Sequence, residues 1–298
     1  MFNKIISLIL LTSQCFAQTA YLATQPTREY VARGHQRLCK LYKIENEVLS
    51  LVEATTRTPS AMIKDDRTGA LSTITPEFTT LSRYQVYNAE NEKIINTLIP
   101  IGGDITRLIQ TGNTIVDHNE YAIFALRRFN PEQLIVIPFN NCSNILFIKE
   151  FNRFYFFGVE TSLMYDTELE SWEEFTGFSR VISSVYENGR CWLGTNDHLT
   201  ICQANEENPT TWQFIREYNF GVLNIDYASN YTVTVNLNQS VSLFQNAYLI
   251  STTDHYEFPL ITINNGIVYV AGTNKLIKIT DNRRNSIYVW GIPVCLTN

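Results

Sequence analysis

Residues Phe154-Tyr155-Phe156-Phe157-Gly158 form an apolar run, and a second run begins at Leu163 after a short polar turn. Short stretches of aromatic and β-branched residues bounded by Asn, Asp, Gly and Glu are typical of β-strands. A continuous apolar run, without polar alternation, indicates a strand that is covered on both faces. The stretch therefore predicts a pair of strands buried between other layers.

The same unit recurs along the chain. Its first runs are Ala122–Leu126, Phe154–Gly158, Cys191–Gly194, Thr232–Asn236 and Val268–Gly272, and its second runs start near Leu134, Leu163, Leu199, Val241 and Leu276. The steps from Phe156 to Trp192, Thr234 and Val270 are 36, 42 and 36 residues. Two earlier hairpins, Leu41–Ile44 with Val48–Val52 and Tyr84–Tyr87 with Ile94–Ile99, fit the second half of the unit. A sequence repeat of this length that consists mainly of strands favours small sheets that stack and cover one another.

We therefore expect an all-β fold, a single β-propeller of about seven antiparallel blades with three to four strands each. Six blades is the alternative, because the repeat between Gly102 and Glu150 is irregular. A pair of β-sandwiches with accidental spacing is the competing interpretation.

The unit from Asn152 to Thr176 resembles a kelch-type repeat. It contains Phe156-Phe157-Gly158, then Met164-Tyr165-Asp166, five further residues and Trp172. The resemblance implies a propeller in which the tyrosine and tryptophan pack between blades and the glycine allows a close backbone approach. Kelch repeats usually carry two adjacent glycines, and here only Gly158 is present. The resemblance supports the architecture and transfers no function.

The first residues have the parts of a secretory signal peptide: Lys4, the apolar run Ile5 to Leu11, and small residues before a cut after Ala17. We expect residues 1–17 to be removed and residues 18–298 to form the propeller. No apolar segment is long enough to span a bilayer. The net charge of −6 and the lack of a basic cluster argue against nucleic acid as a partner. Asn141, Asn230 and Asn238 begin Asn-X-Ser/Thr triplets, which predicts a glycosylated, secreted extracellular protein.

Five cysteines remain after residue 17, and an exported protein can pair them. Folded as a hairpin with Asn196-Asp197 at its tip, where both residues tolerate positive φ, the segment 191–202 places Cys191 opposite Cys202. We expect a disulfide there, and a second one between Cys39 and Cys295, which a closed ring brings near each other. Cys142 would then be unpaired.

The sequence contains no catalytic signature such as a nucleophile elbow, a phosphate-binding glycine loop or a zinc-binding helix. Asp117-His118, Asp197-His198 and Asp254-His255 occupy non-equivalent loops of the repeat, so we expect no shared metal site and no cofactor. Scattered loop residues can still support catalysis, so the question of an enzyme stays open.

Recognition is the function that this pattern favours, because binding residues concentrate on loops held by a rigid scaffold. The candidate ligand-binding residues lie in loops between the first and second runs: Arg127, Arg128, Glu160, Asn196, Asp197, His198, Asn274 and Lys275. We expect a module that binds an extracellular protein or glycan. The alternatives are a propeller hydrolase or lyase acting on glycans or small esters, and a structural component of an extracellular matrix or coat. The oligomeric state is open.

Overall fold

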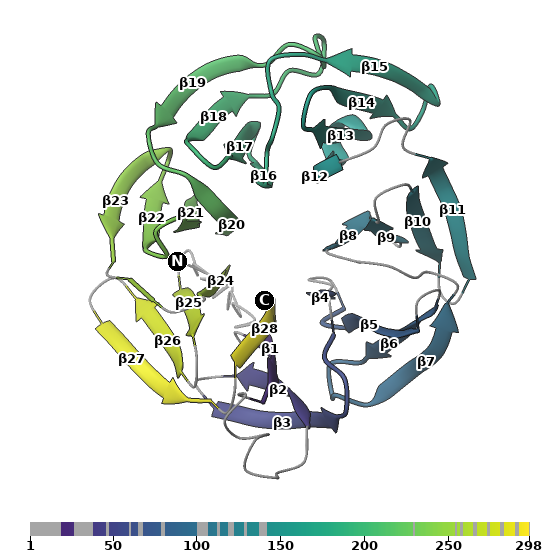
Figure 1. Ribbon diagram of the computed structural model, residues 1–298, viewed down its shortest axis with the longest axis vertical. Helices are drawn as coiled ribbons and strands as arrows, with labels where there is room; N and C mark the ends of the chain where they lie inside the picture. Colours follow the sequence, from purple (N-terminus) through teal and green to yellow (C-terminus); the bar gives the residue numbers. More distant parts are fainter. Residues whose placement is uncertain are drawn as a thin grey trace, which may run out of the picture.

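A computed structural model shows a closed ring of small sheets around a central axis (Figure 1). It describes residues 19–26, 38–45, 48–59, 61–64, 68–78, 81–99, 107–111, 114–118, 122–127, 130–136, 142–228, 230–253, 255–256, 259–264, 267–272, 275–280, 283–289 and 292–297. These residues form seven four-stranded antiparallel sheets, the blades of a β-propeller. The preferred expectation of about seven blades is confirmed, and the described residues contain no helix able to cross a membrane.

The blades are numbered here in chain order, with the strand nearest the axis given first. Blade 1 consists of β28 (Ile292–Thr297), β1 (Thr19–Gln25), β2 (Cys39–Glu45) and β3 (Val48–Thr55). Blade 2 consists of β4 (Ala61–Lys64), β5 (Leu71–Phe78), β6 (Leu81–Tyr87) and β7 (Lys93–Ile99). Blade 3 consists of β8 (Arg107–Thr111), β9 (Thr114–His118), β10 (Ala122–Arg127) and β11 (Asn130–Val136).

Blade 4 consists of β12 (Cys142–Ile148), β13 (Arg153–Gly158), β14 (Ser162–Asp166) and β15 (Ser171–Phe175), with a short 3₁₀ turn η1 (Lys149–Phe151) after β12. Blade 5 consists of β16 (Ser183–Glu187), β17 (Arg190–Gly194), β18 (Leu199–Gln203) and β19 (Gln213–Tyr218). Blade 6 consists of β20 (Val222–Ala228), β21 (Tyr231–Asn236), β22 (Val241–Gln245) and β23 (Tyr248–Thr252). Blade 7 consists of β24 (Leu260–Asn264), β25 (Ile267–Gly272), β26 (Lys275–Thr280) and β27 (Arg283–Tyr288).

Blade 1 closes the ring, because it combines strands from both ends of the described chain. β28 pairs antiparallel with β1, with Leu22 opposite Leu296 and Ala23 opposite Cys295. The innermost strands of successive blades then contact each other around the axis, as β28 with β4 and β24 with β28 do. The last strand therefore belongs to the first blade, and the two ends of the described chain share one sheet.

The hydrophobic core lies between blades. The face of blade 4 contributes Tyr155, Phe157 and Phe175, which pack against Cys191, Leu193 and Trp212 of blade 5. Equivalent clusters fill the spaces between blades 5 and 6, 6 and 7, 7 and 1, and 1 and 2. An isolated blade would expose these faces, so ring closure explains the continuous apolar runs of the sequence.

The repeat predicted from sequence is shifted by one strand relative to the blades. The predicted first runs Phe154–Gly158, Cys191–Gly194, Thr232–Asn236 and Val268–Gly272 are the second strands β13, β17, β21 and β25, whereas Ala122–Leu126 belongs to the third strand β10. The innermost strand β16, Ser183-Ser184-Val185-Tyr186-Glu187, was missed because it is mostly polar.

Five of the seven outermost strands in the described residues carry a register shift that leaves one apolar residue outside the strand pairing. The skipped residues are Val52, Ile94, Leu134, Ile215 and Ile250. Such bulges bend and twist an edge strand away from the geometry that another strand could pair with.

Gly221 shows how closely the blades approach one another. A Cβ at Gly221, which follows β19, would lie 1.9 Å from the carbonyl oxygen of Asn196 in the β17–β18 loop. Backbone hydrogen bonds from Val222 N to Thr195 O, 2.8 Å, and from Leu237 N to Gly221 O, 2.8 Å, fix this contact. The loops at this end of blades 5 and 6 therefore form one rigid unit.

Candidate functional site

The predicted ligand-binding residues do not all lie on one face of the ring. Glu160 and the segment Asn196–His198 lie in loops that join second to third strands, and Lys275 begins the third strand β26 at the same end. Arg127 ends the third strand β10, so it lies at the opposite end of its blade. Arg128 and Asn274 are outside the described residues. The grouping with Arg127 was wrong because β10 had been taken as equivalent to β13.

The Asn196-Asp197 turn has a different origin from the one expected. Neither residue adopts positive φ. Instead, the Thr195 hydroxyl accepts hydrogen bonds from the backbone N–H of Asp197, 3.2 Å, and of His198, 3.1 Å. The side chains of Asn196 and Asp197 are exposed, and their role in ligand binding stays a prediction.

The described residues of the three Asp-His dipeptides lie at one end of the ring. His118 ends the second strand β9, Asp197-His198 lies in the β17–β18 loop, and His255 follows the outermost strand β23, so all three reach the same end of the ring from different blades. The described residues contain no cluster of three or more His, Cys, Asp or Glu side chains placed to hold a metal ion.

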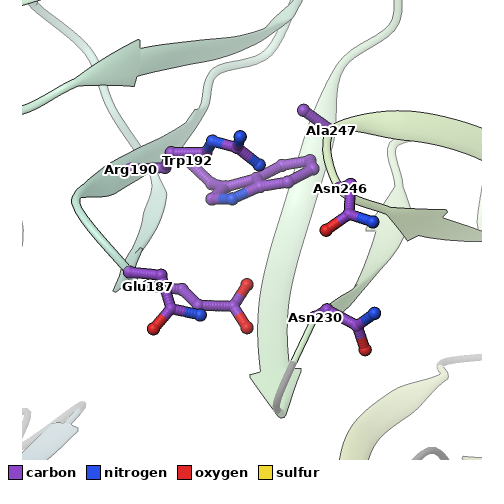
Figure 2. A pocket seen from close by; sticks show the side chains of 7 residues that line it. Glu187, Arg190, Trp192, Asn230, Asn246 and Ala247 are labelled. Atoms are coloured by element: carbon purple, nitrogen blue, oxygen red, sulfur yellow. The ribbon is translucent and has the colours of Figure 1, made fainter.

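A pocket with more distinctive chemistry opens between blades 5 and 6, at the end of the ring opposite the β17–β18 loop. Its volume is about 170 Å³. Figure 2 shows the side chains around it, with the Glu187 carboxylate pointing into the space between the two blades. The lining residues are Glu187, Asn188, Arg190, Trp192, Asn230, Asn246 and Ala247.

Two tight turns form walls of this pocket. Asn188 and Gly189 both adopt positive φ, 48° and 80°, and Glu187 pairs with Arg190 on either side of them. Asn246 and Ala247 repeat the geometry with φ of 50° and 70° between Gln245 and Tyr248. Two-residue turns with positive φ at both positions match the twist of paired strands, and Asn-Gly is the preferred sequence. The pocket walls are therefore hairpin ends with fixed geometry.

Glu187 is the acidic group of the pocket. Its residue is 9% exposed, and its Oε1 atom is buried without a hydrogen-bond partner in the structure. Burial raises the pKa of Glu187 to about 7, although the positive Arg190 and the Thr232 hydroxyl act in the opposite direction. The group therefore titrates near neutral pH, where a carboxyl can either accept or donate a hydrogen bond.

Trp192 supplies a second unsatisfied group. The indole is 2% exposed and packs edge to face against Phe244 of blade 6, with ring centroids 5.3 Å apart. Its Nε1–H donor has no partner. Since buried polar groups normally have a protein or water partner, an acceptor and a donor left open beside one cavity indicate an occupant that forms hydrogen bonds.

The predicted glycosylation sites have different surroundings. Asn230 is exposed and lines the pocket. Asn238 is exposed in the β21–β22 turn, and its Oδ1 accepts a hydrogen bond from the Ser240 hydroxyl, 2.7 Å. Asn141 and the leader residues 1–17 lie outside the described residues. Glycosylation of all three stays a prediction.

The cysteine register was predicted correctly, but the disulfides are absent. Cys191 lies directly opposite Cys202 in the β17–β18 pair, and both carry free thiols, as do Cys39 and Cys142. Directly opposed residues have Cβ atoms about 4.5–5.5 Å apart, wider than the roughly 3.8 Å that a disulfide prefers. Cys39 instead contacts the Thr58 hydroxyl, with Sγ and Oγ1 3.1 Å apart, and the β1 strand separates β2 from Cys295 on β28.

Comparison with solved structures supports the fold alone. A proposed 6-phosphogluconolactonase from Bacteroides uniformis superposes with a TM-score of 0.66 at 12% identity, covering 94% of this chain and 98% of that one. The WD40 propeller domain of Doa1 gives 0.62 at 12% identity, covering 83% and 86%. A chain of the nidogen/laminin complex gives 0.53 at 10% identity, covering 94% and 97%. No family model and no curated protein matches the sequence, so the kelch-like type stays a prediction.

Sequence reasoning missed the pocket. The Glu187-Asn188-Gly189-Arg190 segment is a strong hairpin signal and could have located the first turn. The approach of Asn230 and Asn246 to Trp192 depends on the packing of blade 6 against blade 5, which a single sequence does not display.

Proposed function

We propose that the protein is a secreted recognition module that binds one neutral sugar residue of a glycan in the pocket between blades 5 and 6. The observation that carries the proposal is the open pair of buried hydrogen-bonding groups, Glu187 Oε1 and Trp192 Nε1–H. A sugar hydroxyl both donates and accepts, so a single hydroxyl or a neighbouring pair can satisfy the two groups.

The charges of the pocket favour a neutral ligand. Glu187 and Arg190 are the only ionisable residues among the described residues that line it, and they carry opposite charges once the carboxyl is ionised. An anion would meet the carboxylate and a cation would meet the guanidinium. Asn188, Asn230 and Asn246 add amide groups at the pocket wall.

The size of the pocket favours one sugar unit. Its volume of about 170 Å³ is below the roughly 300–1,000 Å³ of pockets that hold drug-sized molecules. The described lining contains a single carboxylate, whereas glycoside hydrolysis usually uses a pair on either side of the scissile bond. Binding is therefore favoured over the hydrolase alternative. Secretion rests on the leader-like residues 1–17.

Titration calorimetry with neutral monosaccharides tests the proposal on protein treated to remove any N-linked glycan, which at Asn230 would occupy the pocket mouth. We expect the wild-type protein to bind at least one of them. Glu187→Gln and Trp192→Phe should each weaken binding about tenfold, the effect of losing roughly 1.4 kcal/mol of hydrogen bonding.

Glu174→Gln is the matched control, because Glu174 is an exposed carboxylate on β15 of blade 4. It should bind like the wild type. Absence of binding to any neutral sugar, or full affinity in Trp192→Phe, would overturn the proposal. Binding of a Ser- or Asn-containing peptide in place of sugars would identify a protein ligand and would also refute the glycan assignment.

A further inference from the structure

A second pocket lies along the seam between blades 1 and 2 and is lined by charged side chains. Its volume is about 270 Å³. The second and third strands of blade 2 form one wall, and the outer strands of blade 1 form the other. The ionisable residues that matter here are Lys40, Glu53, Arg57, Glu77, Arg83 and Lys93.

Basic residues outnumber acidic residues along this pocket. One carboxylate, Glu53, is matched by Lys93, with Nζ and Oε1 2.6 Å apart. The other, Glu77, is shared by two guanidinium groups: Arg83 Nε lies 2.5 Å from Oε1 and Arg57 Nη1 lies 3.9 Å from Oε2. Glu77 therefore lies between two guanidinium groups. Basic residues outnumber acidic residues in the described lining, although the protein as a whole has a net charge of −6.

Hydrogen bonds within the protein fix the guanidinium groups of both arginines. Arg57 Nη1 also donates to the backbone carbonyls of Pro76, 3.0 Å, and Glu77. Arg83 Nη1 donates to Asn96 Oδ1, 3.1 Å. The Arg57 side chain is still 47% exposed, so its guanidinium remains accessible from the pocket. A planar guanidinium fixed in this way binds the oxygens of carboxylate, sulfate or phosphate groups well.

Neutral polar residues complete the wall. Thr75 and Gln85 line the pocket and are buried, and Thr55 and Thr56 lie at the end of β3. Hydroxyl and amide donors of this kind can complement the guanidinium groups around a small anion. The lining of this pocket differs from that of the pocket between blades 5 and 6, which contains one basic and one acidic residue.

We propose that the pocket between blades 1 and 2 binds a small oxyanion, the carboxylate, sulfate or phosphate group shared by free anions and by acidic sugars. Arg57 and Arg83 contact the anion. The inference rests on a different pocket from the sugar site and stands if that proposal fails.

Titration calorimetry with sodium sulfate and sodium phosphate, at an ionic strength held constant with sodium chloride, tests the inference. We expect the wild-type protein to bind these anions, and Arg57→Gln to bind them with about tenfold lower affinity. Arg57→Lys keeps the charge and should retain part of the affinity, which separates loss of charge from a folding defect. Glu187→Gln should bind sulfate normally, so the two sites are distinguished.

Arg180→Gln is the matched control. Arg180 is an exposed arginine in the segment between blades 4 and 5, and its substitution removes the same charge far from the pocket. Equal weakening in Arg180→Gln and Arg57→Gln would show a diffuse electrostatic effect and overturn the proposal, as would identical heats for sulfate and chloride. Tighter binding of glucuronic acid or a sulfated monosaccharide than of the inorganic anions assigns the oxyanion to a sugar substituent; the reverse order assigns it to a free anion.

Discussion

Glu187→Gln should stabilise the protein at neutral and alkaline pH and leave its stability unchanged in acid. The pKa of Glu187 is raised from its ordinary value of 4.5 to about 7, chiefly by burial. Below the unfolded value the group is protonated in both states and contributes nothing to the pH dependence. Between the two values the folded state holds a proton that the unfolded state has released, so the stability falls as the pH rises.

The size of the effect follows from the same shift. The interval from 4.5 to about 7 corresponds to about 3 kcal/mol at about 1.36 kcal/mol for each pH unit. The pocket is open to water, and solvent screening reduces this penalty, so we expect about 1–2 kcal/mol. Glutamine has the size of the protonated acid and avoids the cost of a buried charge.

Urea unfolding at about pH 4 and about pH 8 measures the difference between the variant and the wild type. Taking the difference removes the titration of other groups, provided that they are unaffected. The control is Glu174→Gln, which removes an exposed carboxylate of blade 4. A variant less stable than the wild type at about pH 8, or an equal difference at both pH values, would refute the reasoning.

Three further outcomes follow from the packing. Phe175→Ala should lose about 3–5 kcal/mol in urea unfolding, because the ring is 1% exposed and lies 5.0 Å from Tyr155 and 4.6 Å from Trp212 between ring centroids; a loss below about 1 kcal/mol would contradict the inter-blade core. Gly221→Ala should lower the free energy of unfolding by about 2–3 kcal/mol, because the new methyl group meets the Asn196 carbonyl. An unchanged thermal midpoint would show that the segment before β20 and the β17–β18 loop are not rigidly joined. Burial raises the pKa of Cys142 to about 12, that of Cys202 to about 11 and that of Cys191 well above its ordinary value, so none should react with iodoacetamide in the native protein at mildly alkaline pH, and all should react in urea; rapid native labelling seen by mass spectrometry contradicts this.

The architecture could be predicted from the sequence because a closed ring requires buried apolar strands in every blade. Second and third strands are buried on both faces, so Phe154–Gly158 and Cys191–Gly194 appear as apolar runs at a nearly constant period. The pairing of Cys191 with Cys202 followed from counting residues across one hairpin. The apolar runs recur at a nearly regular spacing, and the cysteine pairing depends on residues within one hairpin.

The site could not be predicted because it depends on contacts between repeats. In the sequence Trp192 lies in an apolar run and Glu187 precedes Asn188-Gly189, and neither position distinguishes a pocket residue from a core or turn residue. Only the packing of β17 against blade 6 places the Trp192 indole in a pocket with Asn246 and Ala247. The disulfide error has a related cause, since residue counting gives the register but not the separation of the two Cβ atoms.

The register shifts of the outermost strands have a consequence for handling the protein. A ring of seven sheets exposes seven strand edges at its rim, each a potential template for fibril growth. The extra residue in five of them, Ile250 on β23 among them, interrupts the straight ladder that a stacking strand would need. Deleting Ile250 would straighten that edge, and concentrated solutions of the shortened chain should then form aggregates that bind thioflavin T while the parent protein stays clear.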